Sequence, residues 1–241
     1  MGIINTGTVG TALQIISNVI IPLISKNSIG DVSKTGDLDF RPANWIFSIW
    51  GVIYTSVLVG FGLDEGKSLK GMNEKIAYVI ASLSNPSWLL IFTSELDNKF
   101  ILAFATLFIL SISLLYILVN GKFEDEYKFS LIEYALSLYT IWAFSATGLN
   151  LSYIIQNKKT GSTAFTVWSI LLQLLWQLYI IKKTNKATNT LAIPIVCILV
   201  SIAIYTRNTV KNKKALIILG SSIIALINQV RVIVNNNREK N

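Results

Sequence analysis

The chain has 241 residues, of which 52% are hydrophobic and only 14% are charged, and its mean hydropathy is +0.56. A water-soluble domain carries about 25% charged residues, so this composition excludes an ordinary soluble protein and predicts one that crosses a membrane several times. The formal net charge is +8, but Lys and Arg lie mostly in short stretches between apolar runs. That pattern is typical of loops at lipid headgroups, so we expect membrane lipid and no nucleic acid among its partners.

Catalytic and metal-ligating side chains are scarce. The sequence has no histidine and a single cysteine, Cys197, which lies inside an apolar run. It therefore lacks the groups for His-based acid–base catalysis, for a Cys/His metal site and for an intramolecular disulfide. We expect no metal, no covalent cofactor and no enzymatic activity. Glu133 is the only acidic residue inside an apolar run, and we expect its carboxylate to reach the membrane interface near the start of its helix.

Apolar runs of about 17 to 25 residues, the length that spans a bilayer, occur eight times along the chain. They predict an all-α fold, a polytopic transmembrane helical bundle that spans the membrane with about eight helices. The predicted helices cover Gly7–Ser25, Pro42–Leu63, Ile76–Ser94, Phe100–Asn120, Phe129–Ile155, Ala164–Ile181, Thr190–Thr206 and Ala215–Val234.

The segments between these runs predict how the helices are connected. We expect the polar loop Lys26 to Arg41 to fold over the membrane surface. Residues Glu95 to Lys99 form a turn so short that the third and fourth helices must be antiparallel neighbours. Gln156 to Thr163 reads as a loop before the sixth helix. An even number of spans puts both termini on one side, but Lys and Arg divide almost equally between the sides and so select no orientation.

The second predicted helix carries an aromatic face. Pro42 suits the first turn of a helix, where its missing N–H costs nothing. Phe47, Trp50 and Tyr54 follow at spacings of three and four, so they share one side of the helix. Such a face either packs between helices or lines a cavity.

The third predicted helix combines polar and aromatic residues at membrane depth. Asn85 lies in mid-run with Trp88 about one turn further on, and Pro86 removes the backbone hydrogen bond to Ser82. An unpaired polar group in hydrocarbon costs several kcal/mol. Asn85 therefore either fixes helix register through an interhelical hydrogen bond or faces a cavity.

The fifth predicted helix repeats this combination. Tyr139, Trp142, Ala146 and Asn150 fall within a sector of about 80° of the helix. The same two alternatives apply to Asn150. Because three helices each present aromatic residues, two of them beside an asparagine, we favour a lined cavity.

Three motifs resemble the TspO/MBR family, the tryptophan-rich sensory proteins and translocator protein. The family's second helix opens with Pro, a small residue, an aromatic residue and a spaced Trp and Tyr, which match Pro42, Ala43, Trp45, Trp50 and Tyr54. Its third helix carries Leu-x-Asn-x-x-Trp, which matches Leu83, Asn85 and Trp88. Its fifth carries Trp-x-x-x-Ala-x-x-Leu-Asn, which matches Trp142, Ala146, Leu149 and Asn150.

The resemblance covers roughly residues 7 to 158 and implies the family's five-helix region in the first part of the chain. We therefore expect a TspO-like region over residues 1–158, an additional three-helix transmembrane region over 159–234 and a polar tail over 235–241. Members of the family bind porphyrins, haem-type tetrapyrroles and sterols in a helical bundle. A porphyrin, a related tetrapyrrole or a sterol is accordingly the expected hydrophobic small-molecule ligand.

The resemblance also implies which residues contact that ligand. The expected ligand-binding residues are Trp50, Tyr54, Asn85, Trp88, Tyr139, Trp142, Ala146 and Asn150. A short cholesterol-associated pattern that follows the fifth helix in better-known members is matched by Leu151, Tyr153 and Lys158.

The expected function is that of an integral, multi-pass membrane protein that binds or senses a flat hydrophobic molecule. The alternative is a small-solute transporter, because Gln173 gives the sixth helix a polar face, although the internal repeats typical of such carriers are not evident. Gly60, Gly62 and Gly220 are candidates for close helix packing, including packing between two copies in a homodimer.

Overall fold

The computed structural model describes residues 5–35, 41–64, 69–121, 123, 130–155, 158–182, 188–207 and 213–238. These residues are helical and contain no strand, which confirms the predicted all-α bundle. The elements are α1 (Thr6–Ile24), α2 (Ile29–Thr35), a 3-10 turn η1 (Asn44–Ser48), α3 (Ile49–Asp64), α4 (Met72–Thr93), α5 (Lys99–Asn120), α6 (Leu131–Ile155), α7 (Lys158–Lys182), α8 (Ala192–Arg207) and α9 (Lys213–Arg238). Each of the eight predicted helices has a counterpart, and α2 is an additional short helix within the predicted polar loop.

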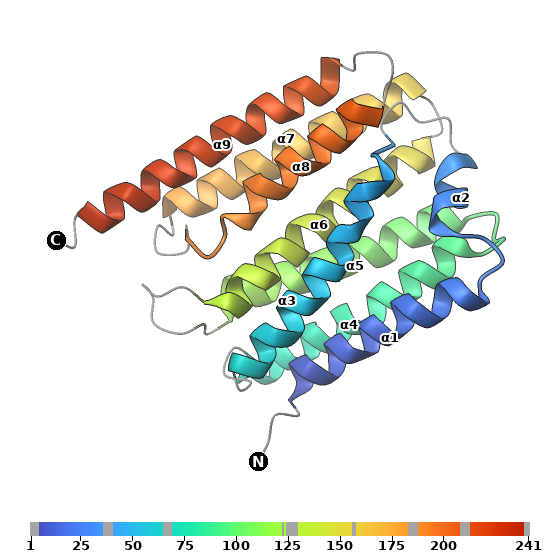
Figure 1. Cartoon of the computed structure of the whole chain (residues 1–241), viewed down its shortest axis with the longest axis horizontal. Coiled ribbons are helices and arrows are strands. Elements are labelled where there is room, and N and C mark those ends of the chain that lie inside the picture. Colours follow the sequence, from blue (N-terminus) through green and yellow to red (C-terminus); the bar gives the residue numbers. More distant parts are fainter. Residues whose placement is uncertain are drawn as a thin grey trace.

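Helix α6 is the centre of the bundle. It packs against α3, α5, α7 and α8, with α1 and α4 to one side and α9 to the other (Figure 1). Of its 25 residues, 19 are buried, so neighbours surround it on nearly every side. This position explains why α6 carries many hydroxyl groups. The side chains of Thr140, Ser145 and Thr147 donate to carbonyl oxygens one turn earlier in α6, so they enter the interior already paired.

The outside of the bundle is apolar and its inside is partly polar. Leu13 and Ile16 on α1, and Leu171 and Leu174 on α7, are exposed, whereas Gln14 is fully buried. Among the described residues, six helical segments are long and apolar enough to cross a bilayer: α1, the segment from η1 through α3, α4, α5, α7 and α9. Apolar surface of this extent is not stable in water, so these faces contact lipid.

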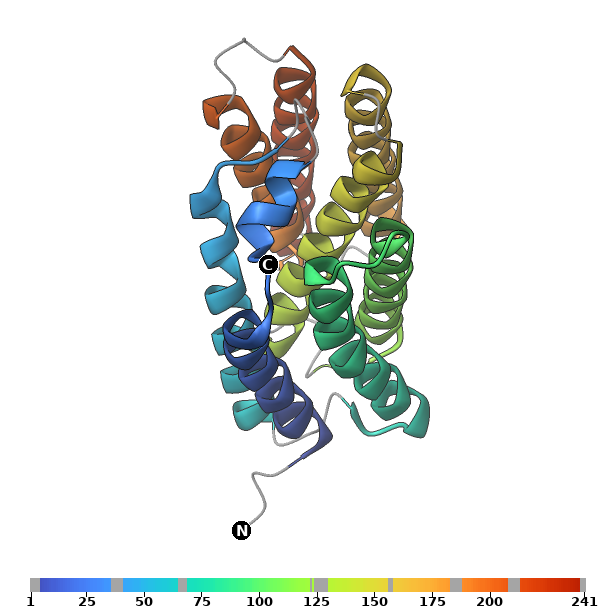
Figure 2. The same cartoon turned by 90° about the vertical axis from the view of Figure 1, so that its right-hand side faces the viewer.

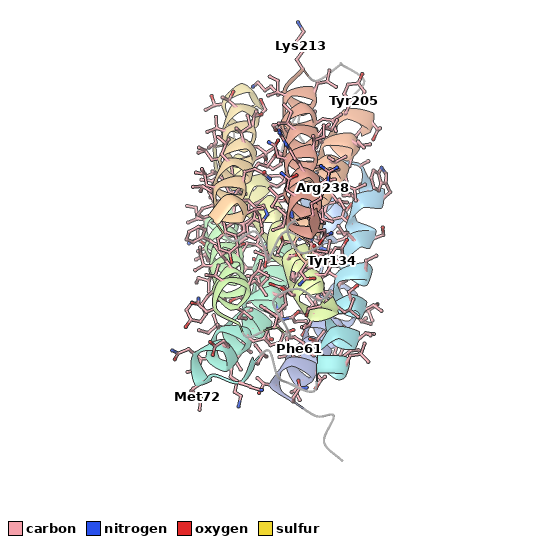
Figure 3. All side chains as sticks on the ribbon, turned by 90° about the vertical axis from the view of Figure 1, so that its left-hand side faces the viewer. Phe61, Met72, Tyr134, Tyr205, Lys213 and Arg238 are labelled. Atoms are coloured by element: carbon pink, nitrogen blue, oxygen red, sulfur yellow. The ribbon has the colours of Figure 1, made fainter. Side chains whose placement is uncertain are left out.

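The course of the chain agrees with an even number of crossings. Helix α1 begins and α9 ends toward the same end of the bundle (Figure 1). Met72 and Lys213, the first residues of α4 and α9, lie at opposite ends (Figure 3). Helix α2 lies at the end that faces the viewer in Figure 2, where it packs against α4. Helices α4 and α5 pack along each other, as the short turn between them predicts.

The start of the second predicted helix is a correction. Ala43 is extended, Pro42 lies outside any helix, and η1 precedes α3, so Pro42 does not occupy the first turn of a helix. The reason is that α8 binds this backbone. The N–H of Ala43 donates to the carbonyl of Ala203 at 2.9 Å, and Arg207 Nη1 donates to the carbonyl of Pro42 at 2.9 Å.

The predicted loop from Gln156 to Thr163 is also wrong, because α7 already begins at Lys158. Its polar first turns find partners on neighbouring helices. Ser152 Oγ of α6 donates to the carbonyl of Gly161 at 3.0 Å, and Lys214 Nζ of α9 donates to the hydroxyl groups of Ser162 and Thr163 at 2.6 and 2.8 Å. These bonds allow a polar sequence to continue the helix.

Two glycines of α3 lie in opposite environments. A Cβ atom on Gly60 would lie 2.9 Å from the Cα atom of Ile132 in α6, so only glycine permits this approach of the two helices. A Cβ atom on Gly62 or on Gly220 of α9 would meet nothing within 4 Å. Close packing at Gly60 therefore occurs within the chain, whereas the other two glycines face open space.

We predict that Gly60→Ala lowers the stability of the bundle by about 1–3 kcal/mol, because the new methyl group meets backbone and α6 must move. Gly62→Ala should change stability by less than about 1 kcal/mol, since it only removes the flexibility of glycine. Thermal unfolding in detergent measures both. Equal midpoints for the two variants would show that α3 and α6 do not approach each other at Gly60.

Candidate functional site

Five aromatic side chains from α3, α4 and α6, which we call the aromatic cluster, meet inside the bundle. They are Trp50, Tyr54, Trp88, Tyr139 and Trp142. Trp50 is the centre of the cluster, because its ring stacks on that of Tyr54 with centroids 5.4 Å apart and an interplanar angle of 19°. The rings of Tyr139 and Trp142 present their edges to Trp50 at 6.0 and 5.8 Å, and Trp88 lies at 6.1 Å. Three helices are thus joined through one indole.

A hydrogen-bond network borders the cluster. Asn85 Oδ1 of α4 accepts from the hydroxyl of Tyr54 at 3.0 Å and from Nδ2 of Asn18 in α1 at 2.8 Å. Asn18 Nδ2 also lies 2.9 Å from the Tyr54 hydroxyl oxygen. Asn85 therefore links α1, α3 and α4, which is the interhelical role considered for it, and it does so directly beside the aromatic rings.

A cavity of about 40 Å³ lies on the other side of Trp50. It is lined by Ile29, Arg41, Pro42, Phe47, Trp50, Trp88, Phe92, Trp142, Ala146, Leu149, Asn150 and Tyr153. Within the described part of the chain, Nε1 of Trp88, Nε1 of Trp142 and Oδ1 of Asn150 are buried without a hydrogen-bond partner. The amide nitrogen of Asn150 is paired, since it donates to the carbonyl of Ala146 at 2.9 Å. These three residues line the cavity together with Arg41, whose Nε is likewise buried without a partner among the described residues.

A larger groove of about 570 Å³ runs between α1 and α3 and reaches α2 and η1. Its lining comprises Ile15, Asn18, Val19, Ile29, Gly30, Asn44, Phe47, Trp50, Gly51, Tyr54 and Thr55. Ile29, Phe47 and Trp50 line both spaces, so these side chains separate the groove from the cavity. Pockets that hold small molecules have volumes of roughly 300–1,000 Å³, a range that includes the groove and excludes the cavity.

The structure brings most of the expected ligand-binding residues together. Trp50, Trp88, Trp142, Ala146 and Asn150 line the cavity. Tyr54 lines the groove. Asn85 is buried and accepts a hydrogen bond from the Tyr54 hydroxyl, and the ring of Tyr139 is buried against the ring of Tyr54.

The residues of the cholesterol-associated pattern have different surroundings. Tyr153 is buried, stacks on Phe100 with centroids 5.1 Å apart and lines the cavity. Leu151 is half-buried. The side chain of Lys158 lies outside the described residues.

Sequence reasoning did not select Asn18 or Arg41 for this site. Gln14 and Asn18 stand four residues apart in the first apolar run, and this pair of polar side chains on one helix face was a usable signal. Arg41 stands at the end of a polar loop, where the sequence predicts solvent exposure. Its burial depends on the packing of the segment before η1 and has no signal in the sequence.

The expectation for Glu133 is wrong. Glu133 is only 1% exposed, so protein covers its carboxylate and it is not solvated as expected. Asn189, in the turn before α8, covers it and donates from Nδ2 to Glu133 Oε2 at 2.7 Å. The other end of the same amide accepts from the backbone N–H of Ser130 at 3.0 Å. The turn before α8 therefore covers the start of α6.

A further groove of about 460 Å³ lies between α5, α6 and α7, and Phe144, Trp168 and Trp176 are among its lining residues. Its lining is almost entirely apolar, which suits contact with lipid chains. It does not share a lining residue with the aromatic cluster. We therefore regard the cluster, with its unpaired polar atoms, as the candidate ligand site.

Comparison with known proteins identifies the family. A sequence profile of the family described as TSPO-like protein matches residues 3–234. The match extends past residue 158, where the motif resemblance ends, and includes α7, α8 and most of α9. No curated protein and no solved structure matches the chain. With several helices long enough to span a bilayer, the chain is an integral membrane protein and belongs to the TSPO-like protein family.

Proposed function

We propose that the protein binds a flat, largely apolar small molecule of the tetrapyrrole type at the aromatic cluster, and that it acts in sequestering or sensing this molecule. The observation that carries this proposal is that Trp50 lies between a groove of about 570 Å³ and a small cavity. The family membership supports it, because the resemblance in sequence implies ligands of this class. The role is one of binding and not of catalysis.

Binding in this position requires the rings to move. The cavity of about 40 Å³ is too small for a tetrapyrrole, but the side chains of Phe47 and Trp50 are the partition between it and the groove. Both side chains are only partly buried. Rotation of Trp50 away from Tyr54 would join the two spaces, and the flat ligand would replace the ring contacts that Trp50 gives up.

The unpaired polar atoms favour a ligand that has polar groups at its edge. Each buried donor or acceptor without a partner costs about 1–3 kcal/mol. Nε1 of Trp88, Nε1 of Trp142 and Oδ1 of Asn150 have no partner among the described residues. A ligand that satisfies them recovers this energy on binding, which an entirely apolar molecule cannot do.

A small-solute transporter is supported less well by the described residues. Transport needs a polar path near the middle of the membrane. The groove between α5, α6 and α7 is nearly all apolar, and in the structure as it stands Ile29, Phe47 and Trp50 separate the groove between α1 and α3 from the cavity. Ligand binding remains our proposal.

Replacing two cavity-lining residues tests where the ligand lies. We predict that protoporphyrin IX quenches the tryptophan fluorescence of the wild-type protein saturably, and that Trp142→Phe combined with Asn150→Leu raises Kd at least about tenfold, because two polar contacts are lost. Trp176→Phe is the matched control, since it removes one indole from the groove between α5, α6 and α7. Weakening by Trp176→Phe with no effect of the double variant would place the ligand in that other groove.

Filling the groove between α1 and α3 tests the route of entry. A Cβ atom on Gly51 would meet nothing within 4 Å, so Gly51→Leu extends into the groove without a backbone collision. We predict that this variant keeps its unfolding temperature and raises the Kd for protoporphyrin IX at least about tenfold, because the side chain occupies ligand space.

Gly62→Leu is the control for that experiment, because Gly62 has the same open surroundings on the same helix and does not line the groove. It should bind like the wild type. If Gly51→Leu also binds like the wild type, the ligand does not use this groove.

A further inference from the structure

Arg41 is a buried cation at the ligand site. It lies between α2 and η1, its side chain is only 9% exposed, and it lines the cavity together with Trp88, Trp142 and Asn150. Removing a charge from water is costly, so buried arginines are normally paired with a carboxylate or bonded through most of their donors.

Arg41 has few partners of its own. Its Nη2 donates to the carbonyl of Gly30 at 3.3 Å, and within the described residues its Nε is buried with no hydrogen-bond partner. The ion pair that the described residues form joins Lys26 to Glu95 and does not involve Arg41. Asp31 acts on Arg41 through its charge but makes no ion pair with it, and its carboxylate accepts from the Ser28 hydroxyl.

A second cation stands near the same cavity wall. Arg207 donates from Nη1 to the carbonyl of Pro42 at 2.9 Å and to Asn44 Oδ1 at 3.2 Å. Burial and the like charge of Arg207 lower the pKa of Arg41 from its ordinary value. This end of the site is therefore positive, and the positive charge is incompletely compensated by the described residues.

We propose that the ligand is an amphipathic acid, whose flat apolar body lies against the aromatic cluster and whose carboxylate accepts hydrogen bonds from the Arg41 guanidinium. This inference rests on the proposed function and narrows it, because it selects acidic tetrapyrroles and disfavours neutral sterols. A guanidinium offers planar, paired donors that match the two oxygens of a carboxylate. The ligand thereby supplies the counter-charge that the cavity lacks.

The test compares protoporphyrin IX with its dimethyl ester, which has the same ring and no carboxylate. Kd is measured by tryptophan quenching with the protein in phosphatidylcholine nanodiscs, whose zwitterionic lipid adds no competing acid, and empty nanodiscs correct for partitioning. We expect the acid to bind the wild-type protein about 10- to 100-fold more tightly than the ester, the usual range for a hydrogen bond to a charged group.

Variants of Arg41 then assign the preference to this side chain. Arg41→Gln should weaken the acid to the level of the ester and leave ester binding nearly unchanged, and Arg41→Lys should keep part of the preference. The ratio of the two Kd values within each variant cancels any difference in how the ligands partition into lipid. Arg231→Gln, on the distant part of α9, should keep the full wild-type ratio.

The outcomes separate this inference from the proposed function. If acid and ester bind the wild type equally and saturably, the inference is overturned and the tetrapyrrole site stands. If Arg41→Gln weakens acid and ester by the same factor, Arg41 acts only on local structure through Gly30, which also overturns the inference. If neither ligand binds saturably, the proposed function fails as well.

Discussion

Polar side chains within a bilayer have no water to bind, so each must find a partner in the protein or in a ligand. This constraint organises the interior of the bundle. The hydroxyl groups of α6 bind carbonyls of their own helix, and Asn85 binds Asn18 and Tyr54 on two other helices. Some polar atoms left over by this pairing lie around the aromatic cluster, at Trp88, Trp142 and Asn150, while others lie elsewhere, on Gln14 and Gln173 among them. At the cluster, which also adjoins a groove, a ligand could supply the missing partners.

Trp50 connects the fold to the proposed site. Its ring contacts α4 and α6 as well as its own helix, and it is also part of the partition between the groove and the cavity. In this structure the five aromatic rings pack against one another and so occupy the site. A ligand would replace these contacts, so the cost of opening the cluster is offset by stacking of the same rings on the ligand.

The sequence predicted the helices well because membrane length and apolar composition leave few alternatives to a helix. It also predicted which residues would meet around the cavity, since Trp50, Trp88, Trp142, Ala146 and Asn150 occupy the positions of the family motifs. What it could not predict depends on contacts between distant segments. Arg207 of α8, more than 150 residues away in the sequence, binds the backbone carbonyl of Pro42. The burial of Glu133 depends on Asn189.

We propose that the ligand binds around Trp50, between α1, α3, α4 and α6. The most direct test is a crystal structure of the protein with bound protoporphyrin IX. We predict ligand density that continues from the groove between α1 and α3 into the cavity beside Arg41, with the Trp50 ring rotated away from Tyr54. Density confined to the groove between α5, α6 and α7, with the aromatic cluster unchanged, would show that the ligand does not bind around Trp50.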